Sequence, residues 1–175
     1  MNSMKIAIIG NPGSGKSTLA AKLHAITSIP VYHLDQYFWK PGWQRPDRAE
    51  FEKTHNELCD RDSWIIEGMA VRHFDYRAEK AEVIIFLDIP LWLCLYRIFN
   101  RAITCYGTVR DSSAKGCPEP LPSWEFLSYV WNFNRKHKPI VESLLEKYKS
   151  QKKIFVVKNN AELNELIKKF ESKEI

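Results

Sequence analysis

The sequence lacks any long hydrophobic run. Its longest nearly apolar stretch, residues 83–96, is interrupted by Asp88 and Pro90, whereas a helix that spans a membrane needs about 20 consecutive apolar residues. The apolar run near the first residue, 6–9, is followed at once by a glycine-rich turn, which is too short for the apolar region of a secretory signal peptide. We therefore expect no membrane span and no signal peptide.

Paired cysteine motifs are also missing. The four cysteines, Cys59, Cys94, Cys105 and Cys117, form no Cys-x-x-Cys pair, and no two histidines have the spacing of zinc ligands. Scattered cysteines in a chain of this size are typical of reduced thiols, so we expect a cytoplasmic protein. Cys105 and Cys117 flank one loop, which leaves a metal or redox role for this pair as the alternative.

The composition shows no extreme either. The chain has 175 residues, of which 45% are hydrophobic and 27% charged, and this is ordinary globular usage. Disordered, collagen-like and coiled-coil classes are therefore excluded. A chain of this length buries roughly 70% of the surface that its unfolded form exposes, which suffices for one full core. We predict a single domain over residues 1–175.

Positive charge is concentrated in one part of the chain. Residues 97–153 hold 11 Lys and Arg but only 5 Asp and Glu, whereas residues 1–96 hold 11 basic and 12 acidic side chains. A field of this kind suits the phosphates of a nucleotide or of a nucleic acid. A basic surface that is simply solvated is the alternative.

Short apolar runs alternate with helical patterns along the chain. Strands are predicted at 5–10, 31–34, 64–67, 83–87 and 154–157. Helices are predicted at 16–25, from Asp47 to 60, from Pro90 to 102, from Ser123 to 145 with a break at Pro139, and from Asn159 or Asn160 onward, with one more allowed between 67 and 83. Residues 103–122 show no periodicity and are predicted to be a loop.

This alternation predicts the fold class. Strands that are separated by helices form a parallel sheet with helices on both faces. We therefore predict a three-layer α/β/α sandwich with a five-stranded parallel sheet. Ligands of such folds bind beyond the carboxyl ends of the strands, where the polar residues that follow each predicted strand gather.

One glycine-rich segment matches the phosphate-binding pattern G-x-x-x-x-G-K-[ST]. It consists of Gly10, Asn11, Pro12, Gly13, Ser14, Gly15, Lys16 and Ser17, and Thr18 follows. Its glycines let backbone N–H groups converge on phosphate oxygens, and the following helix adds the partial positive charge of its N-terminus. Lys16 can bridge the β- and γ-phosphates, and Ser17 can bind Mg²⁺. We predict ATP or another nucleoside triphosphate as a ligand.

The chain resembles the P-loop nucleoside and nucleotide kinases, the adenylate-kinase-like group. It is most similar to the bacterial DNA topology modulation proteins, through residues 10–18, 33–43, 64–68 and 129–138. The resemblance implies a P-loop kinase fold, with an acceptor-binding segment at about 35–62 and a helical or loop lid at about 103–122. It also implies ATP- and Mg²⁺-dependent phosphoryl transfer to a nucleoside, a nucleotide or a similar hydroxyl compound.

The same resemblance carries an alternative function. Related folds act on many substrates, and the family is named for an effect on DNA topology. A nucleotide-regulated DNA-binding protein without small-molecule kinase activity is therefore the second hypothesis, and DNA is the secondary candidate partner. No helix-turn-helix, zinc finger or aromatic RNA-binding signature supports it in the sequence.

Three carboxylates follow predicted strands. The resemblance implies that Asp35 contacts the acceptor hydroxyl or Mg²⁺, and a carboxylate there can accept the hydroxyl proton during transfer. It also implies that Glu67 holds Mg²⁺ through water, although Asp is more usual at that place. Asp88 is the rival metal ligand, and its alternative role is that of a helix N-cap.

The candidate arginines are grouped around the predicted lid. Arg97 and Arg101 lie four residues apart on one helix face and resemble the arginines that flank a lid and contact the nucleotide. Arg110 and Arg135 are further candidates, because one guanidinium group can donate two parallel hydrogen bonds to phosphoryl oxygens. Arg72 follows Glu67 and resembles an arginine that binds an acceptor phosphate. A solvated surface charge is the alternative for each of them.

Aromatic residues supply the last candidates. Trp39, with Trp43, can stack an acceptor ring or cover the edge of the core. We expect His33 to be structural. Trp124, Tyr129 and Trp131 have helical spacing, and we expect them in the core.

Overall fold

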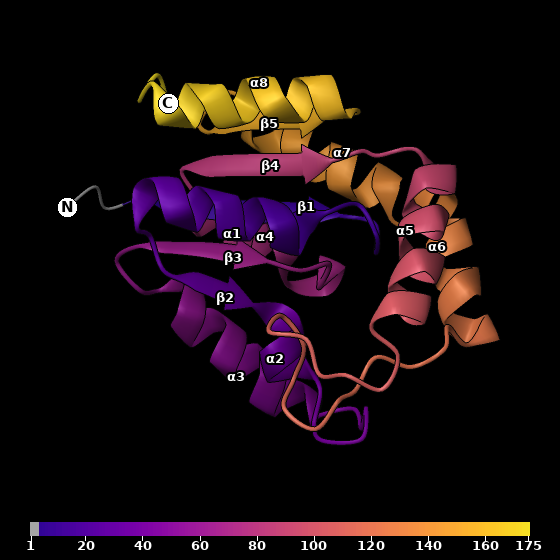
Figure 1. Ribbon diagram of the computed structural model, residues 1–175. Helices are drawn as coiled ribbons and strands as arrows, with labels where there is room; N and C mark the ends of the chain where they lie inside the picture. Colours follow the sequence, from indigo (N-terminus) through magenta and orange to yellow (C-terminus); the bar gives the residue numbers. More distant parts are fainter. Residues whose placement is uncertain (1–3) are drawn as a thin grey trace.

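Five parallel strands form the central layer of the protein. The computed structural model describes residues 4–175 (Figure 1). The strands are β1 (Lys5–Gly10), β2 (Val31–His33), β3 (Trp64–Glu67), β4 (Val83–Leu87) and β5 (Lys153–Val157). They pair in the order β2-β3-β1-β4-β5, and every pair is parallel. The first strand of the sequence, β1, therefore lies at the centre of the sheet, and the predicted five-stranded parallel sheet is confirmed.

Eight α-helices and one short 3₁₀ helix connect the strands in the described part of the chain. They are α1 (Lys16–Thr27), α2 (Leu34–Phe38), α3 (Arg48–Cys59), η1 (Val71–His73), α4 (Phe74–Lys80), α5 (Leu91–Thr104), α6 (Trp124–Lys136), α7 (Lys138–Tyr148) and α8 (Asn160–Glu171). The five residues of α2 are too few for a helical period to show in the sequence, and this helix was not predicted. Within residues 4–175, none of these helices has the length and apolar character that crossing a membrane requires.

The helices cover both faces of the sheet. Along β1, Ile6 and Ile8 point toward α1 and α8, whereas Ala7 and Ile9 point toward α3, α4, α6 and α7. All four side chains are fully buried, as expected for a strand covered on both faces. Figure 1 shows α1 in front of the sheet and α4 behind it, and the three-layer α/β/α fold class is confirmed.

Side-chain caps fix three helix starts as the sequence predicts. The Asp47 carboxylate accepts from the backbone N–H groups of Ala49 and Glu50, at 2.9 and 3.2 Å. Ser123 and Asn159 cap α6 and α8 in the same way. Glu50 does not complete a capping box with Asp47, because its carboxylate pairs with Lys40 instead.

The apolar residues of α5 and α6 are only partly buried. Cys94, Ile98 and Ala102 are the buried residues of α5. Trp124 and Trp131 of α6 are 84% and 65% exposed, so their predicted place in the core is wrong. Both helices are apolar on more than one side, and helical spacing alone cannot tell which side meets the sheet.

The cap of α3 leads to a stability prediction. Replacing Asp47 by alanine should lower the free energy of unfolding by about 1 kcal/mol, because two N–H groups of the first turn lose their acceptor. Asp47→Asn keeps an oxygen acceptor and should stay within a few tenths of a kcal/mol of the parent. Urea unfolding of the three proteins measures both effects. Equal losses for Ala and Asn would show that the carboxylate charge matters and that the cap does not.

Candidate active site

The glycine-rich loop forms a cradle at the carboxyl end of β1. Gly13 and Gly15 have φ angles of 80° and 102°, a left-handed region that side chains disfavour. A Cβ atom on Gly13 would lie 2.4 Å from the Cys94 carbonyl oxygen, so only glycine fits there. Gly15 caps α1 without a side-chain hydrogen bond, and the first turn of α1 holds no acidic residue. The N-terminal N–H groups of α1 are therefore available to an anion.

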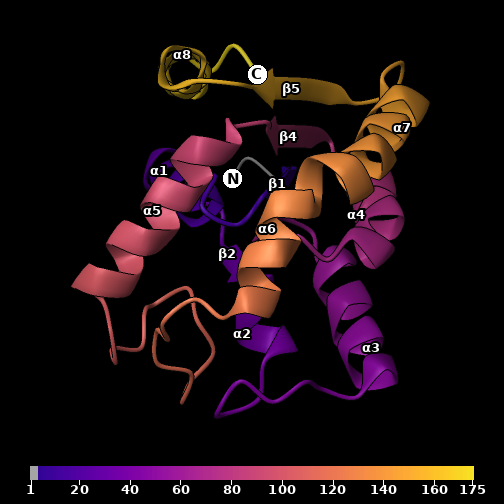
Figure 2. The ribbon, with the colours of Figure 1, turned by 90° about the vertical axis from the view of Figure 1, so that its right-hand side faces the viewer.

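Two helices hold this loop in place. Arg97 of α5 donates from Nη1 to the Ser14 carbonyl oxygen at 2.9 Å. Asn11 donates from Nδ2 to the Val130 carbonyl oxygen of α6 at 3.1 Å. Figure 2 shows α5 and α6 on the same side of the molecule, with the end of β1 behind them. Arg97 therefore lies beside the glycine-rich loop, and its predicted contact with the nucleotide stays a prediction.

Lys16 lies over the loop that it follows. Its Nζ donates to the carbonyl oxygens of Gly10 and Asn11, at 2.9 and 3.0 Å. Burial lowers the pKa of Lys16, and the nearby carboxylates of Glu67 and Asp35 act in the opposite direction. The ammonium group is thus held at the mouth of the cradle, where a bound polyphosphate would meet it.

Glu67 joins the loop to the neighbouring strands. Ser17 donates from Oγ to Glu67 Oε1 at 2.9 Å, and His33 Nδ1 lies 2.6 Å from the same oxygen. His33 and Glu67 end the adjacent strands β2 and β3 and are paired in register. Burial raises the pKa of Glu67, but the hydrogen bond with His33 and the charge of Lys16 outweigh it, so the pKa is lowered overall. Glu67 is therefore held as a carboxylate.

Asp35 lies across the cleft from Lys16, in the first turn of α2. The side chain is exposed. Loss of hydration to the surrounding protein atoms and repulsion from the Glu67 carboxylate raise the pKa of Asp35, while the positive charges of Lys16 and Arg110 oppose the rise. Burial and the nearby Asp35 carboxylate also raise the pKa of Tyr129 to about 12. Tyr129 is half-buried and belongs to this cleft rather than to the core in which it was predicted.

Asp88 takes no part in this cluster. Its carboxylate accepts from Lys138 Nζ at 2.8 Å, and Pro90, rather than Asp88, is the N-cap of α5. The N-cap role that the sequence offered for Asp88 is therefore wrong. The Lys138 ammonium neutralises the carboxylate that was the rival metal ligand.

The oxygen atoms of Ser17 and Glu67 suit Mg²⁺. Within residues 4–175, no group of three or more His, Cys, Asp and Glu side chains could hold a metal ion by itself. Mg²⁺ is usually bound through one or two carboxylates together with substrate phosphates and water. The donor pair beside the cradle fits this pattern, because the phosphates complete the shell.

The segment between α5 and α6 is held by a buried carboxylate that the sequence did not single out. Glu119 is 5% exposed and accepts from Arg101 Nε and Arg110 Nε, both at 2.7 Å. Arg101 and Arg110, which were both predicted to contact the nucleotide, meet at this carboxylate. One glutamate therefore fixes the end of α5 to the middle of the loop.

The same segment docks on the residues that follow Asp35. Gly42 N–H donates to the Gly116 carbonyl oxygen at 2.9 Å, and Trp43 Nε1 donates to the Pro118 carbonyl oxygen at 2.9 Å. The rings of Trp39 and Trp43 form a T-shaped pair with centroids 5.6 Å apart. Trp43 thus joins the two segments, and the half-buried Trp39 packs against it.

The cysteines form no disulfide in the described part of the chain. All four are free thiols. Cys117 is buried and its Sγ donates to the Lys40 carbonyl oxygen at 3.2 Å, which adds a further contact between the docked segments. The alternative redox pairing of Cys105 with Cys117 gains no support from this arrangement.

Two predicted arginines lie outside the cluster. Arg72 on η1 and Arg135 on α6 are exposed, and neither makes a side-chain hydrogen bond or an ion pair within residues 4–175. His33, in contrast, was expected to be structural, but it contacts Glu67 in the cluster. Its position two residues before Asp35, at the end of a predicted strand, was the signal that could have assigned it to the site.

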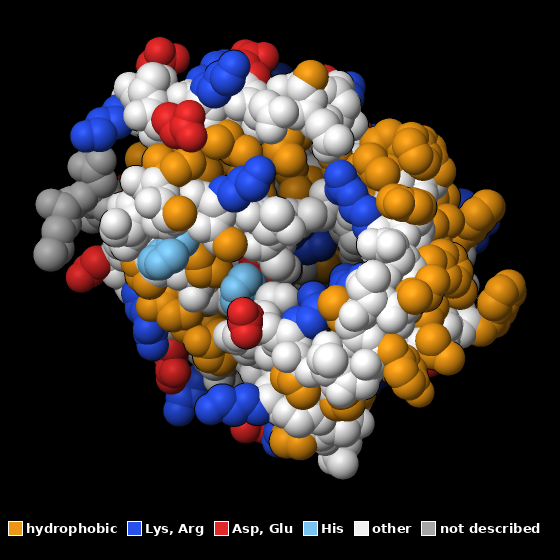
Figure 3. All heavy atoms as spheres, viewed as in Figure 1, with side chains coloured by type: hydrophobic (Ala, Val, Ile, Leu, Met, Phe, Trp, Pro, Cys, Tyr) orange, Lys and Arg blue, Asp and Glu red, His pale blue; other side chains and the backbone are white. Residues whose placement is uncertain are grey.

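The basic residues of 97–153 do not form one outward-facing patch. Arg97, Arg101 and Arg110 point inward to the loop and to Glu119, and Lys138 and Lys147 pair with Asp88 and Asp75. Figure 3 shows a hollow on the face of Figure 1, with Lys and Arg side chains gathered inside it. Arg97, Arg101 and Arg110 are therefore bound within the protein and do not add to an outward-facing basic surface.

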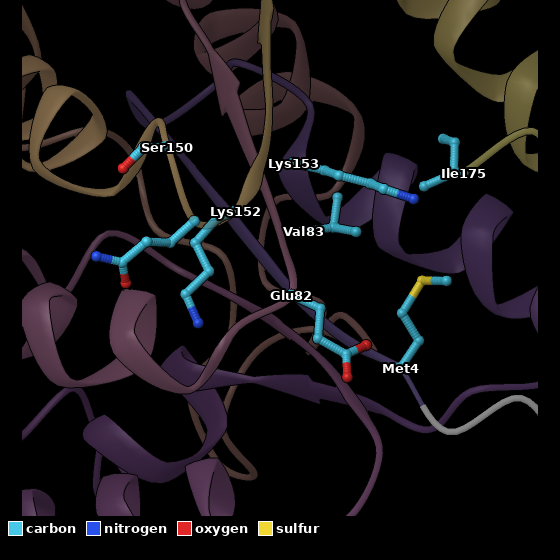
Figure 4. Close-up of a pocket in the computed structure, with 8 residues that line it drawn as sticks. Met4, Glu82, Val83, Ser150, Lys152, Lys153 and Ile175 are labelled. Carbon is cyan, nitrogen blue, oxygen red and sulfur yellow. The ribbon is translucent and has the colours of Figure 1, made fainter.

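A second hollow lies at the opposite end of the sheet. It has a volume of about 520 Å³ (Figure 4). Residues at the amino ends of β1, β4 and β5, among them Met4, Glu82 and Lys152, line it together with Ile175. None of the residues of the glycine-rich loop lines it. It is distant from the carboxyl edge of the sheet, where the candidate chemistry gathers.

Comparison with solved structures identifies the fold. Shikimate kinase from Acinetobacter baumannii, solved in complex with shikimate, aligns over 96% of this chain and 90% of its own, with a TM-score of 0.60 and 15% identity. A gluconokinase from Sinorhizobium meliloti aligns over 97% and 90%, with a TM-score of 0.56 and 16% identity. Deoxyadenosine kinase from M. mycoides, with bound dCTP, aligns over 97% and 100%, with a TM-score of 0.50 and 14% identity.

These neighbours are all kinases, and the chain has the fold of P-loop kinases. No protein-family model matches the chain, and no curated protein matches it. The predicted P-loop kinase fold is therefore confirmed over nearly the whole chain.

The double ion pair of Glu119 leads to a second prediction. Glu119→Gln should lower the free energy of unfolding by about 2–3 kcal/mol, because two partly buried guanidinium groups lose their charged acceptor. Glu125→Gln is the matched control, since its ion pair with Arg45 is largely exposed and should contribute less than about 1 kcal/mol.

Urea unfolding measures both variants, and limited trypsin digestion reports on the loop itself. We expect faster cleavage at Arg110 and Lys115 in Glu119→Gln alone. Equal cleavage rates in the two variants would mean that Glu119 does not hold the loop.

Proposed function

We propose that this protein is an ATP- and Mg²⁺-dependent P-loop kinase that phosphorylates a hydroxyl group of a small acceptor. One observation carries the proposal: Lys16, Ser17, Glu67 and Asp35 converge at the carboxyl edge of the sheet, beside a glycine-rich cradle. The kinase fold of the neighbours supports it. The acceptor class is a nucleoside, a nucleotide or a similar hydroxyl compound.

The cradle and Lys16 would bind the triphosphate. Backbone N–H groups of the loop and of the α1 N-terminus face the β- and γ-phosphates in this arrangement. The Lys16 ammonium, held over the loop by the carbonyl oxygens of Gly10 and Asn11, balances the charge of the transferring group. Arg97, already bound to the Ser14 carbonyl oxygen, keeps the loop in its curled form.

Ser17 and Glu67 would hold the magnesium ion, which supplies charge neutralisation on the phosphates when it is bound. His33 is a positioning residue here, because its hydrogen bond to Glu67 Oε1 orients the carboxylate and favours its charged form. Glu67 in turn orients the Ser17 hydroxyl.

Asp35 is the proposed general base. Its raised pKa makes it a stronger proton acceptor than an ordinary aspartate, and a base works best when its pKa approaches the working pH. Its exposed position in the cleft allows an acceptor hydroxyl to reach it. The acceptor would lie between residues 35–62 and the lid of residues 103–122, with Trp39 at its edge. Arg101 and Arg110 would close over the transfer from their shared carboxylate.

The alternative function is nucleotide-regulated DNA binding that modulates DNA topology. In that function the basic residues of 97–153 would bind the phosphates of DNA instead of those of a nucleotide. The inward direction of Arg97, Arg101 and Arg110 favours the kinase. We place Arg72 and Arg135 outside the transfer site, as exposed charges that an acceptor phosphate could still reach. We also propose that the chain works as one domain in the cytoplasm, as the free cysteines suggest.

The decisive experiment is an ATP-consumption assay with Mg²⁺ against a panel of nucleosides, nucleoside monophosphates and small hydroxylated metabolites. One acceptor should raise turnover well above background hydrolysis. Lys16→Ala should lower kcat/KM by more than about 100-fold, because it removes a charge that stabilises the transition state. Asp35→Asn should lower kcat by about 100- to 10,000-fold and remove the acidic limb of the pH profile.

The controls separate chemistry from binding. Asp35→Asn should retain ATP binding, and Lys22→Ala, on the exposed side of α1, should retain activity. If no acceptor stimulates turnover while ATP still binds, the kinase proposal fails. DNA binding whose affinity falls linearly with log salt and changes with nucleotide would then support the alternative.

The role of His33 is tested through the pH dependence of Mg²⁺ activation. The hydrogen bond from His33 helps to lower the pKa of Glu67, so the carboxylate persists to lower pH. His33→Ala removes this effect and should raise that pKa. Activation by Mg²⁺ should then be lost at a higher pH as the solution is acidified.

His33→Asn keeps an N–H donor and should restore part of the wild-type profile. His24→Ala is the control, because His24 lies on α1 and contacts the Ile29 carbonyl oxygen instead. A pH profile that is identical in wild type and His33→Ala would remove His33 from the site.

A further inference from the structure

The outer side of α5 exposes a continuous apolar stripe. Trp92, Tyr96, Phe99 and Ile103 are 69%, 64%, 47% and 78% exposed. Their spacing of four, three and four residues places them on one side of the helix, in the seam pattern by which two helices pack together. The opposite side of the same helix carries Cys94, Ile98 and Ala102 in the core. One side of α5 thus packs in the core, and a second apolar side has no partner within residues 4–175.

The stripe is free of charge. The only charged residues of α5 are Arg97 and Arg101, and both are bound on the inner side, to the Ser14 carbonyl oxygen and to Glu119. A neutral stripe can meet a copy of itself without repulsion between like charges. An anionic or cationic partner, in contrast, would find no opposite charge along the stripe.

The stripe is also symmetric about its centre. When two copies of α5 pack antiparallel about a two-fold axis between Tyr96 and Phe99, Trp92 meets Ile103 of the second copy and Tyr96 meets Phe99. Such an arrangement is isologous, because each contact occurs twice. A parallel arrangement about a two-fold axis along the helices would instead place each residue opposite its own copy, Trp92 against Trp92 and Ile103 against Ile103.

The exposed area is sufficient for a stable dimer. Large hydrophobic side chains bury about 150–250 Å² each, so the exposed fractions of the α5 stripe correspond to roughly 500 Å² per chain. Trp124 and Trp131 of α6, which are 84% and 65% exposed, add roughly 350 Å². A standard interface needs about 800 Å² per partner, and monomers rarely expose continuous apolar patches larger than a few hundred Å².

The two helices face the same side of the molecule. Figure 2 looks onto α5 and α6 together, and Figure 3 shows hydrophobic side chains gathered along the edge that these helices occupy. We propose that this surface, formed by the α5 stripe with Trp124 and Trp131, is a homodimer interface in which two copies of α5 pack antiparallel. The phosphate cradle lies on the inner side of α5, so the interface leaves both sites accessible.

The first test is the molecular mass in solution. Sedimentation equilibrium of the full chain should give twice the 20.5 kDa of one chain. Phe99→Glu should raise the dissociation constant of the dimer by more than about 100-fold, because the two-fold axis buries two unpaired carboxylates. Val156→Glu is the matched control, since Val156 is 43% exposed on β5, away from the stripe, and should stay dimeric. Circular dichroism and ATP binding establish that both variants are folded.

The second test measures the helix orientation directly. Cys105 is first replaced by serine to remove a nearby thiol. Oxidation of a mixture of Trp92→Cys and Ile103→Cys chains should then give a cross-linked heterodimer, whereas either chain alone should not cross-link. In an antiparallel pair, residue 92 of one copy lies about 16 Å along the helix from residue 92 of the other, at about 1.5 Å per residue. This separation exceeds the reach of a disulfide.

Three results would overturn the proposal. The first is a wild-type chain that sediments as a monomer at every concentration tested. The second is a dimer that Phe99→Glu leaves intact, since another surface would then carry the contact. The third is a monomer that floats with vesicles of phosphatidylcholine and phosphatidylglycerol, which would assign the stripe to a membrane surface instead.

Discussion

The close seating of the glycine-rich loop against α5 is the constraint on which the rest of the site depends. Gly13 lies so near the Cys94 carbonyl oxygen that a methyl group could not be added without moving the helix. Arg97 of the same helix binds the Ser14 carbonyl oxygen. The loop therefore keeps its curled shape only while α5 stays in place, and the position of α5 in turn depends on Glu119 and on the core residue Ile98.

A second set of contacts connects three neighbouring strands through one carboxylate. Glu67 at the end of β3 receives a hydrogen bond from Ser17, which follows β1, and contacts His33 at the end of β2. Parallel strands deliver their carboxyl ends to one edge, so these residues meet although 50 and 34 positions separate them along the chain. Burial would favour the neutral form of Glu67, and the hydrogen bonds and Lys16 reverse this preference.

Sequence reasoning succeeded where the physical rule is local. The glycine-rich pattern, the five apolar strands and the caps at Asp47 and Ser123 depend on a few adjacent residues, and each was found in the structure. It failed where a residue's role depends on a distant partner. Trp131 has the spacing of a core residue and is exposed, Asp88 has the position of an N-cap and pairs with Lys138, and Glu119 carries no local signal at all.

The sequence by itself determined the fold class and the phosphate loop, because alternating strands and helices and one glycine-rich turn leave few arrangements open. Only the tertiary structure decided which charged groups work together. It separated Glu67 from Asp88, brought His33 to the cleft, turned Arg101 and Arg110 toward Glu119, and left one side of α5 uncovered. The reason is that ion pairs and exposed faces arise from side chains distant in the chain, whose approach no local pattern encodes.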